Sequence, residues 1–258
     1  MKKIVLLLLL IVFTLSACQR KDLILVTTTS LENSGLLDYL IPHFEQEHNI
    51  KISVIAVGTG AALRYGERGM ADLLIVHDVD KEIDFIHQGF GLSRSPWLYN
   101  DFIIVGPHTI EHTALEDLLE TTLNNHHFYS RGDASGTHAK ELSLWDSLKI
   151  DPTLYPNHYF ETGQSMEATL LMASQKGYYT LTDRSTFLFM QEQLNLTIVY
   201  ENPTLLINPY SIIEVNPDLH NRSTYYANLL HQWLLSEEAY TLISQYKIQD
   251  EPLFHRHP

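Results

Sequence analysis

Cysteine is nearly absent from this chain, which has one Cys in 258 residues. A single Cys cannot close an intramolecular disulfide, so the folded protein must be held by its hydrophobic core. Positive charge is also scarce, because 17 Lys and Arg stand against 31 Asp and Glu, a formal net charge of -14. The sequence has no basic run of the kind that binds nucleic acid. We therefore expect no nucleic-acid partner.

One long apolar run is present, at the N-terminus. Lys2 and Lys3 precede an apolar stretch over 4–15, and small residues follow it, which is the pattern of a secretory signal peptide over residues 1–17. The stretch is too short to span a bilayer comfortably. Leu-Ser-Ala-Cys at 15–18 matches the bacterial lipobox, so we expect an exported protein anchored to the bacterial membrane by a lipid on Cys18, periplasmic or on the outer face of the cell membrane. The alternative is a plain signal peptide, or a membrane anchor, with a chance Cys.

Strand-like and helix-like segments alternate over the first third of the mature chain. Apolar runs at 22–26 and 71–77 and an alternating run at 51–57 predict strands, and each is followed by a helical pattern, at 36–44, 81–87 and 61–69 respectively. This alternation predicts a parallel sheet with crossover helices, in which ligands bind at the C-terminal ends of the strands. Those ends carry the hydroxyls of residues 27–30 and the glycines of 58–60. The alternatives to a ligand site are that Thr29 with Glu32 forms a helix capping box, and that the glycines only make a turn.

A second α/β series follows. We expect a loop containing Pro96 over 91–100 and a strand over 101–107 that leaves the first half. Further expectations are helices at 115–123, 139–148 and 166–175, an extended return at 205–215 and one long amphipathic helix through 226–240. Two α/β halves joined by two extended crossings predict a hinged, two-lobe protein with its ligand between the lobes. The expected division is a signal peptide at 1–17, lobe 1 at 18–102 plus 206–258, and lobe 2 at 103–205.

The most informative stretch is Tyr-Ser-Arg-Gly-Asp-Ala-Ser-Gly-Thr-His at 129–138, which joins a strand end to a helix start. A guanidinium, hydroxyls and free helix N–H groups together indicate an anion pocket. Because the overall charge would repel an anion, local donors must supply the attraction. A site with donors only suits an oxyanion that carries no proton. The predicted ligand-binding residues are Thr28, Thr29, Ser30, Thr59, Gly60, Ala61, Arg131, Ser135 and Thr137.

Other interpretations of this loop remain open. Arg131 could form an exposed ion pair with Asp133 that contributes little energy. Arg-Gly-Asp at 131–133 is also the integrin-type adhesion tripeptide. Ser135, His138 and Asp133 are the residue types of a hydrolytic triad, but within six residues they cannot readily adopt its geometry, and no Gly-x-Ser-x-Gly is present. We expect no enzyme and no catalytic residues, with a hydrolase or transferase on the same scaffold as the alternative. The 14 His residues show no convincing metal-binding pattern, so we expect no metal site.

Six blocks in order resemble the TupA-type tungstate-binding proteins, the solute receptors of bacterial tungstate ABC importers. They lie at 27–30, 57–60, 71–77, 103–107, 130–138 with Lys140 and Glu141, and 179–184. The resemblance implies an α/β type II periplasmic-binding-protein fold, with a mainly parallel, helix-flanked sheet in each lobe and two hinge crossings. It also implies no cofactor, a tungstate oxyanion as ligand, an ABC permease as partner and a monomeric receptor. Molybdate is the nearest alternative ligand, followed by sulfate or phosphate.

The resemblance also assigns roles by position. Thr28, Thr29 and Ser30, with Thr59 and the backbone after it, would hold one side of the anion; the other side would be held by Arg131 and Thr137. Departures from the family pattern occur at Ala61, where Gln is common, at Ala134, where an acidic residue is common, and at Ser185, where Gly is common. These departures bear on selectivity among oxyanions more than on the class of ligand.

Overall fold

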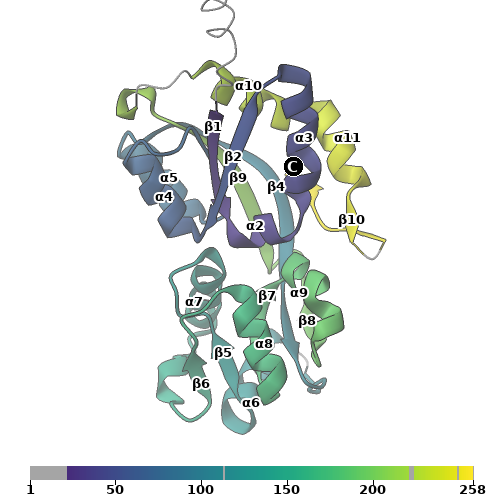
Figure 1. Cartoon of the computed structure of the whole chain (residues 1–258). Helices are drawn as coiled ribbons and strands as arrows, with labels where there is room; N and C mark the ends of the chain where they lie inside the picture. The colour runs from purple at the N-terminus through teal and green to yellow at the C-terminus, as the bar shows by residue number, and fades with distance from the viewer. Residues whose placement is uncertain (1–21, 113, 221–223, 249, 258) are drawn as a thin grey trace, which may run out of the picture.

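The protein is described here from a computed structural model that covers residues 22–112, 114–220, 224–248 and 250–257. The predicted signal peptide and Cys18 lie outside these residues. Figure 1 shows an upper and a lower lobe joined by long strands. No helix in the described part of the chain is long and apolar enough to cross a membrane.

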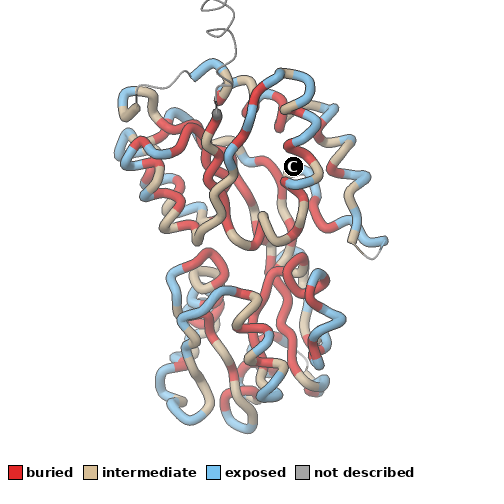
Figure 2. Tube along the Cα trace, in the orientation of Figure 1, coloured by how far each residue is buried: buried red, intermediate tan, exposed pale blue. Residues whose placement is uncertain are grey.

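The upper lobe is built on the first strand–helix units. Parallel strands β1, β2 and β3 pair in the order β2-β1-β3. Strand β9 then pairs antiparallel with β3, and β4 pairs antiparallel with β9. The apolar runs of the sequence become buried strands, and Figure 2 shows the buried chain along the centre of each lobe. The bounds are β1 Asp22–Thr28, α2 Thr29–Asn33, α3 Leu36–His48, β2 Lys51–Val57, α4 Thr59–Glu67, β3 Leu73–Val76 and α5 Val79–His87.

Strand β4 (Gly91–Gly106) corrects one expectation. Instead of a loop followed by a short strand, 16 residues form one continuous strand that belongs to both lobes. Pro96 signals a break locally, but its missing N–H is tolerated because the pairing with β9 is irregular between Pro96 and Leu98. The neighbouring Trp97 is fully buried, and its indole N–H donates to Leu234 O at 2.8 Å.

The lower lobe repeats the α/β pattern. Strand β5 pairs in parallel with β6 and β7, while β4 runs antiparallel to β7 and β8. Strand β9 then returns beside β4 into the upper lobe, so these strands are the two crossings. The bounds are α6 Leu115–Asn125, β5 Phe128–Ser130, α7 Gly136–Leu148, β6 Tyr159–Glu161, α8 Met166–Lys176, β7 Tyr179–Asp183, α9 Arg184–Met190, β8 Thr197–Glu201 and β9 Ile207–Val215.

The C-terminal region packs back on the upper lobe and corrects a second expectation. The single helix predicted through 226–240 is two helices, α10 (Tyr225–Leu234) and α11 (Glu237–Gln245). The break falls at Ser236, whose Oγ accepts from Ala239 N at 3.2 Å and caps α11. Short strands β10 (Lys247–Ile248), β11 (Glu251–Pro252) and β12 (His255–Arg256) follow, and β12 pairs with β4. The expected α/β, two-lobe architecture is confirmed, whereas the residue boundaries of the lobes stay a prediction.

Candidate functional site

The end of β1 places hydroxyls at the start of α2, on the edge of the upper lobe that faces the lower one (Figure 1). The cap of α2 is Thr28, because Thr28 Oγ1 accepts from Leu31 N at 3.3 Å, so the alternative in which Thr29 is the cap is wrong. The buried Ser30 hydroxyl lies 3.2 Å from that of Thr28, and Thr29 is half-buried. Thr27 instead donates to Ile75 O at 3.1 Å and ties β1 to β3. A capping oxygen accepts one N–H and keeps its own hydrogen to donate, so Thr28 can serve both cap and ligand.

The start of α4 brings the second predicted cluster. Gly58 is its cap, and Gly60 and Ala61 are half-buried in the first turn. Thr59 is fully buried, and its hydroxyl has no hydrogen-bond partner among the described residues. A buried polar group without a partner costs about 1–3 kcal/mol, so this hydroxyl needs an acceptor. The unbonded N–H groups of the first helical turn add partial positive charge beside it.

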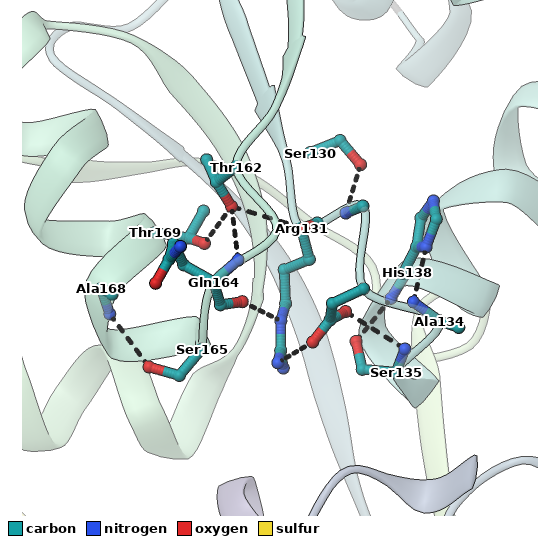
Figure 3. Close-up of polar contacts among 12 residues, drawn as sticks. Ser130, Arg131, Ala134, Ser135, His138, Thr162, Gln164, Ser165, Ala168 and Thr169 are labelled. Carbon is teal, nitrogen blue, oxygen red and sulfur yellow. Dashed lines mark hydrogen bonds and ion pairs between the residues drawn. The ribbon is translucent and has the colours of Figure 1, made fainter. Parts of the chain in front are cut away.

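Arg131 lies at the end of β5 and is 5% exposed. Its Nε donates to Gln164 O at 3.2 Å and its Nη2 to the Asp133 carboxylate, so Figure 3 shows it between Gln164 and the Ala134–Ser135 turn. Asp133 also accepts from Ser135 N at 3.1 Å, which ties the guanidinium to the start of α7. The ion pair weighed as an alternative therefore forms, but around a buried guanidinium. Buried in this way, Arg131 is not displayed as an adhesion tripeptide requires.

The turn after Arg131 depends on a left-handed backbone. Gly132 has φ +60°, and a Cβ there would lie 2.6 Å from the Cβ of Glu161, so only glycine fits. Ala134 has φ 58°, a conformation that is unfavourable for a residue with a Cβ. Together these residues reverse the chain, so that β5 leads directly into α7.

Helix α7 begins at Gly136, three residues before the expected start at 139, because Ser135 caps it. Ser135 Oγ accepts from His138 N at 3.2 Å, and His138 Nδ1 accepts from Ala134 N at 3.1 Å. The imidazole therefore holds the backbone and does not take a proton from Ser135, so these contacts do not form a hydrolytic triad. Thr137 is 1% exposed, and within the described ranges its hydroxyl, like that of Thr59, has no partner.

The starts of α4 and α7 meet across the lobes. A Cβ placed on Gly60 would lie 4.0 Å from Ala134 O, and one on Gly136 would lie 2.6 Å from the His77 ring. A groove of about 290 Å³ is lined by residues that include His77 and Gly136, and a groove of about 440 Å³ by residues that include Gly60 and Ala134. The structure thus brings the 59–61 segment close to the 134–137 segment. The buried Arg131 precedes the 134–137 segment in the same loop.

Sequence reasoning missed three residues at this junction. His77, at the end of β3, stacks on Tyr210 with ring centroids 5.0 Å apart, and its Nδ1 lies 2.6 Å from Asn208 Oδ1. The Tyr210 hydroxyl lies 3.3 Å from Ser30 Oγ. Burial lowers the pKa of His77, so the imidazole is neutral. The position of His77 after a buried parallel strand was a usable signal; Asn208 and Tyr210 gave none before their strand pairing was known.

The chemistry of this junction is that of hydrogen-bond donation. It offers hydroxyls, helix N–H groups and the buried guanidinium of Arg131, and Asp133 beside that guanidinium already accepts from Arg131 and Ser135 N. Nowhere in the described ranges do three or more His, Cys, Asp or Glu side chains come together to hold a metal ion. The arrangement is suited to an anion without protons.

Comparison with known proteins gives a consistent result. A family model described as "PBP superfamily domain" matches residues 16–238. The tungstate-binding protein TupA of Peptoclostridium acidaminophilum is 42% identical over 234 residues, covering 87% of this chain and 81% of the relative.

Solved structures agree with this match. A tungstate ABC transporter structure from Geobacter sulfurreducens is 40% identical, with a TM-score of 0.79 over 88% of this chain and 99% of that one. The tungstate-binding protein TupA of Desulfovibrio alaskensis G20 is 36% identical, with a TM-score of 0.78 over 92% and 98%. The strand order β2-β1-β3-β9-β4 and these matches confirm the expected type II periplasmic-binding-protein fold.

Proposed function

This chain belongs to the periplasmic-binding-protein superfamily and, within it, to the family of TupA tungstate-binding proteins, and from that premise we propose that it binds tungstate between its lobes and delivers it to an ABC importer. In this role it is a receptor and not an enzyme. The ligand is a tetrahedral oxyanion, and molybdate, which is nearly the same size, is the first competitor.

The observation that carries the proposal is a pair of buried hydroxyls. Thr59 and Thr137 begin helices in different lobes, and neither hydroxyl finds a hydrogen-bond partner in the part of the chain that the structure describes. An oxyanion between the two helix starts would accept from both hydroxyls and from the adjacent N–H groups. Because those donors come from two lobes, the anion would favour the conformation in which the lobes are close.

The remaining predicted residues complete this site in the proposal. Thr28, Thr29 and Ser30 donate from the end of β1, and Gly60 contributes its backbone N–H beside Thr59. Ala61 lines the site without a free N–H, because its N–H donates to Gly58 O at 2.9 Å. Arg131 supplies the one full positive charge, and Ser135 keeps its hydroxyl hydrogen while capping α7. These assignments account for the burial of Arg131, which is 5% exposed although it carries a charge.

Selection against phosphate follows from the same contacts. Hydrogenphosphate carries a proton and needs an acceptor, for which Asp133 or Asp183 would have to enter the cleft. Asp133 is occupied by Arg131 and Ser135 N. Asp183 accepts from the Ser185 hydroxyl at 2.6 Å, from the Thr186 hydroxyl at 2.7 Å and from Thr186 N at 2.9 Å. With both carboxylates engaged, the site favours tungstate, molybdate or sulfate.

Delivery requires the receptor to remain near its permease. We propose that the protein is exported by its N-terminal signal, anchored at the bacterial membrane by a lipid on Cys18 and active as a monomer. The several acyl chains of a bacterial lipoprotein would hold it more firmly than one.

Calorimetric titration of the ligand-stripped protein with tungstate, molybdate, sulfate and phosphate tests the proposal. Tungstate and molybdate should bind most tightly, and Thr59→Val and Thr137→Val should each weaken tungstate binding by about tenfold, since each loses one hydrogen bond to a charged group. Thr122→Val is the matched control, because Thr122 is a buried helical Thr whose hydroxyl donates to Leu118 O at 2.8 Å. Wild-type protein that binds none of the four anions contradicts the proposed function.

A further inference from the structure

A chain of hydrogen bonds between buried side chains links the two crossing strands to the hydroxyls at the start of α2. From the lower lobe upward it runs Asp183, Ser185, Asn100, Asn208, Tyr210, Ser30. Each of these residues is at most 3% exposed. Asn100 and Asn208 are opposite one another in the pairing of β4 with β9, so the chain passes through both crossings.

Asp183 determines which group donates and which accepts in each hydrogen bond of the lower part of this chain. Its carboxylate receives the Ser185 hydroxyl at 2.6 Å together with two donors from Thr186, and an ionised carboxylate only accepts. The Ser185 hydrogen is therefore committed to Asp183. The 3.1 Å contact between Ser185 Oγ and Asn100 must then be donated by the Asn100 amide nitrogen. That orientation turns Asn100 Oδ1 toward Asn208.

Asn208 continues the same order of donors and acceptors into the upper lobe. Its amide nitrogen has two hydrogens, of which one goes to Asn100 Oδ1 at 2.7 Å and the other to the Tyr210 oxygen at 3.2 Å. The carbonyl oxygen of Asn208 then faces His77 Nδ1 at 2.6 Å, and the neutral imidazole carries its hydrogen on that nitrogen. Every amide orientation is thus determined from the Asp183 carboxylate.

The chain ends at the proposed oxyanion site. Tyr210 accepts from Asn208, so its single hydrogen is directed to Ser30 Oγ at 3.3 Å. Burial raises the pKa of Tyr210, which keeps this hydrogen in place. Ser30 accepts from Tyr210, Thr28 accepts from Leu31 N, and the 3.2 Å contact between the two hydroxyls uses one of their hydrogens. The pair therefore has one hydrogen left to donate to an anion.

We infer that Asn208 and Tyr210 are positioning and specificity-determining residues of the oxyanion site, an inference that rests on the proposed function. They act through the linked hydroxyls of Ser30 and Thr28: Tyr210 donates to Ser30, and the hydrogen that remains on the linked pair is directed to the anion. A hydroxyl in a free orientation can donate to an anion or accept from a protonated one. Held as a donor, the linked pair of hydroxyls favours tungstate, molybdate or sulfate and disfavours an oxyanion that carries a proton, such as hydrogenphosphate.

The test is Tyr210→Phe, which keeps the ring stacked on His77 and removes the hydrogen bond to Ser30. Tungstate affinity is measured by calorimetry, and phosphate affinity at pH 7 is measured by displacement of tungstate. Tyr210→Phe should weaken tungstate binding and not phosphate binding, so that the ratio of the two affinities falls by about fivefold or more, which corresponds to one neutral hydrogen bond. The matched control is Tyr179→Phe, a fully buried Tyr that donates to His108 O at 3.0 Å, and it should leave the ratio unchanged.

A second measurement separates positioning from a general loss of stability. In a Ser30→Ala background, Tyr210→Phe should change tungstate affinity by less than about twofold, because its effect passes through the missing hydroxyl. An unchanged affinity ratio in Tyr210→Phe, or an equal loss in the Ser30→Ala background, overturns the inference. If Tyr210→Phe does not fold, Asn208→Ala releases the Tyr210 hydrogen and must lower the same ratio. Wild-type protein that binds no oxyanion overturns the proposed function, which is a different outcome.

Discussion

Gly136→Ala places one methyl group in the contact between the lobes. A Cβ at this position would lie 2.6 Å from both Cε1 and Nε2 of His77 and 2.9 Å from Nδ1. Carbon atoms in favourable contact are about 3.5–4.0 Å apart, so the ring would have to withdraw by about 1 Å. It cannot do so freely, because it stacks on Tyr210 with centroids 5.0 Å apart and bonds Asn208 at 2.6 Å.

The magnitude follows from where the overlap occurs. Crowding a packed site costs about 1–3 kcal/mol, and here the crowding exists only when the lobes are close. Opening the hinge relieves it, so the cost is taken from ligand binding. Tungstate affinity should fall by about 5- to 150-fold. The free protein should not lose stability, since Ala is a better helix former than Gly in α7.

The assay combines calorimetric titration with tungstate and thermal melting of the ligand-free protein. Gly58→Ala is the matched control, because a Cβ there meets nothing within 4 Å, and it should bind tungstate as the wild type does. A Gly136→Ala affinity within about twofold of the wild type would refute the argument that the lobes must meet at His77 for the ligand to be held.

Three further predictions concern charge. Arg131→Ala should weaken tungstate binding by about 2–5 kcal/mol, because it removes charge-assisted hydrogen bonds from a buried site, and unchanged affinity in calorimetry would exclude Arg131 from that site. Glu141 accepts from Trp145 Nε1 at 3.0 Å and Tyr159 OH at 2.8 Å, and burial raises its pKa to about 7. The folded protein therefore holds this proton more tightly than the unfolded chain, so the contribution of Glu141 to stability is lost as pH rises from about 4.5 through 7. The free energy of unfolding of Glu141→Gln, relative to that of the wild type, should therefore be greater at pH 8 than at pH 5 by up to about 3 kcal/mol, which urea melts at the two pH values measure. Burial and neighbouring His residues lower the pKa values of His126 and His127, so the unfolded chain binds more protons than the folded protein below pH 6.5. The wild type should therefore lose stability as pH falls from 6.5 to 5, and His126→Gln should lose less. An equal dependence of stability on pH in the variant and the wild type would contradict this.

Local patterns were sufficient to predict most of the strand–helix units. The alternating run at 51–57 coincides with β2, and the apolar run at 71–77 contains β3, because a buried strand followed by a helix leaves its signal within a few residues. Element starts were less certain, as in α7, where the cap at Ser135 lies within the loop that also carries Arg131. The start of α7 is marked by one side-chain hydrogen bond, from His138 N to Ser135 Oγ.

Long-range pairing was the part that the sequence could not supply. Pro96 is a valid local signal against a strand, yet the ladder with β9 keeps it in β4. Asn100 and Asn208 become neighbours only through that same register, across 108 positions of sequence. The candidate ligand residues could be proposed from motifs, whereas the side chains that orient them could be recognised only in three dimensions.

The most direct test of the account is a crystal structure with tungstate, with anomalous data collected at a tungsten absorption edge. The account predicts one strong anomalous peak between the starts of α4 and α7, within hydrogen-bonding distance of the hydroxyls of Thr59 and Thr137 and near the Arg131 guanidinium. A bound tungstate in any other place, or one that contacts a single lobe, would contradict it.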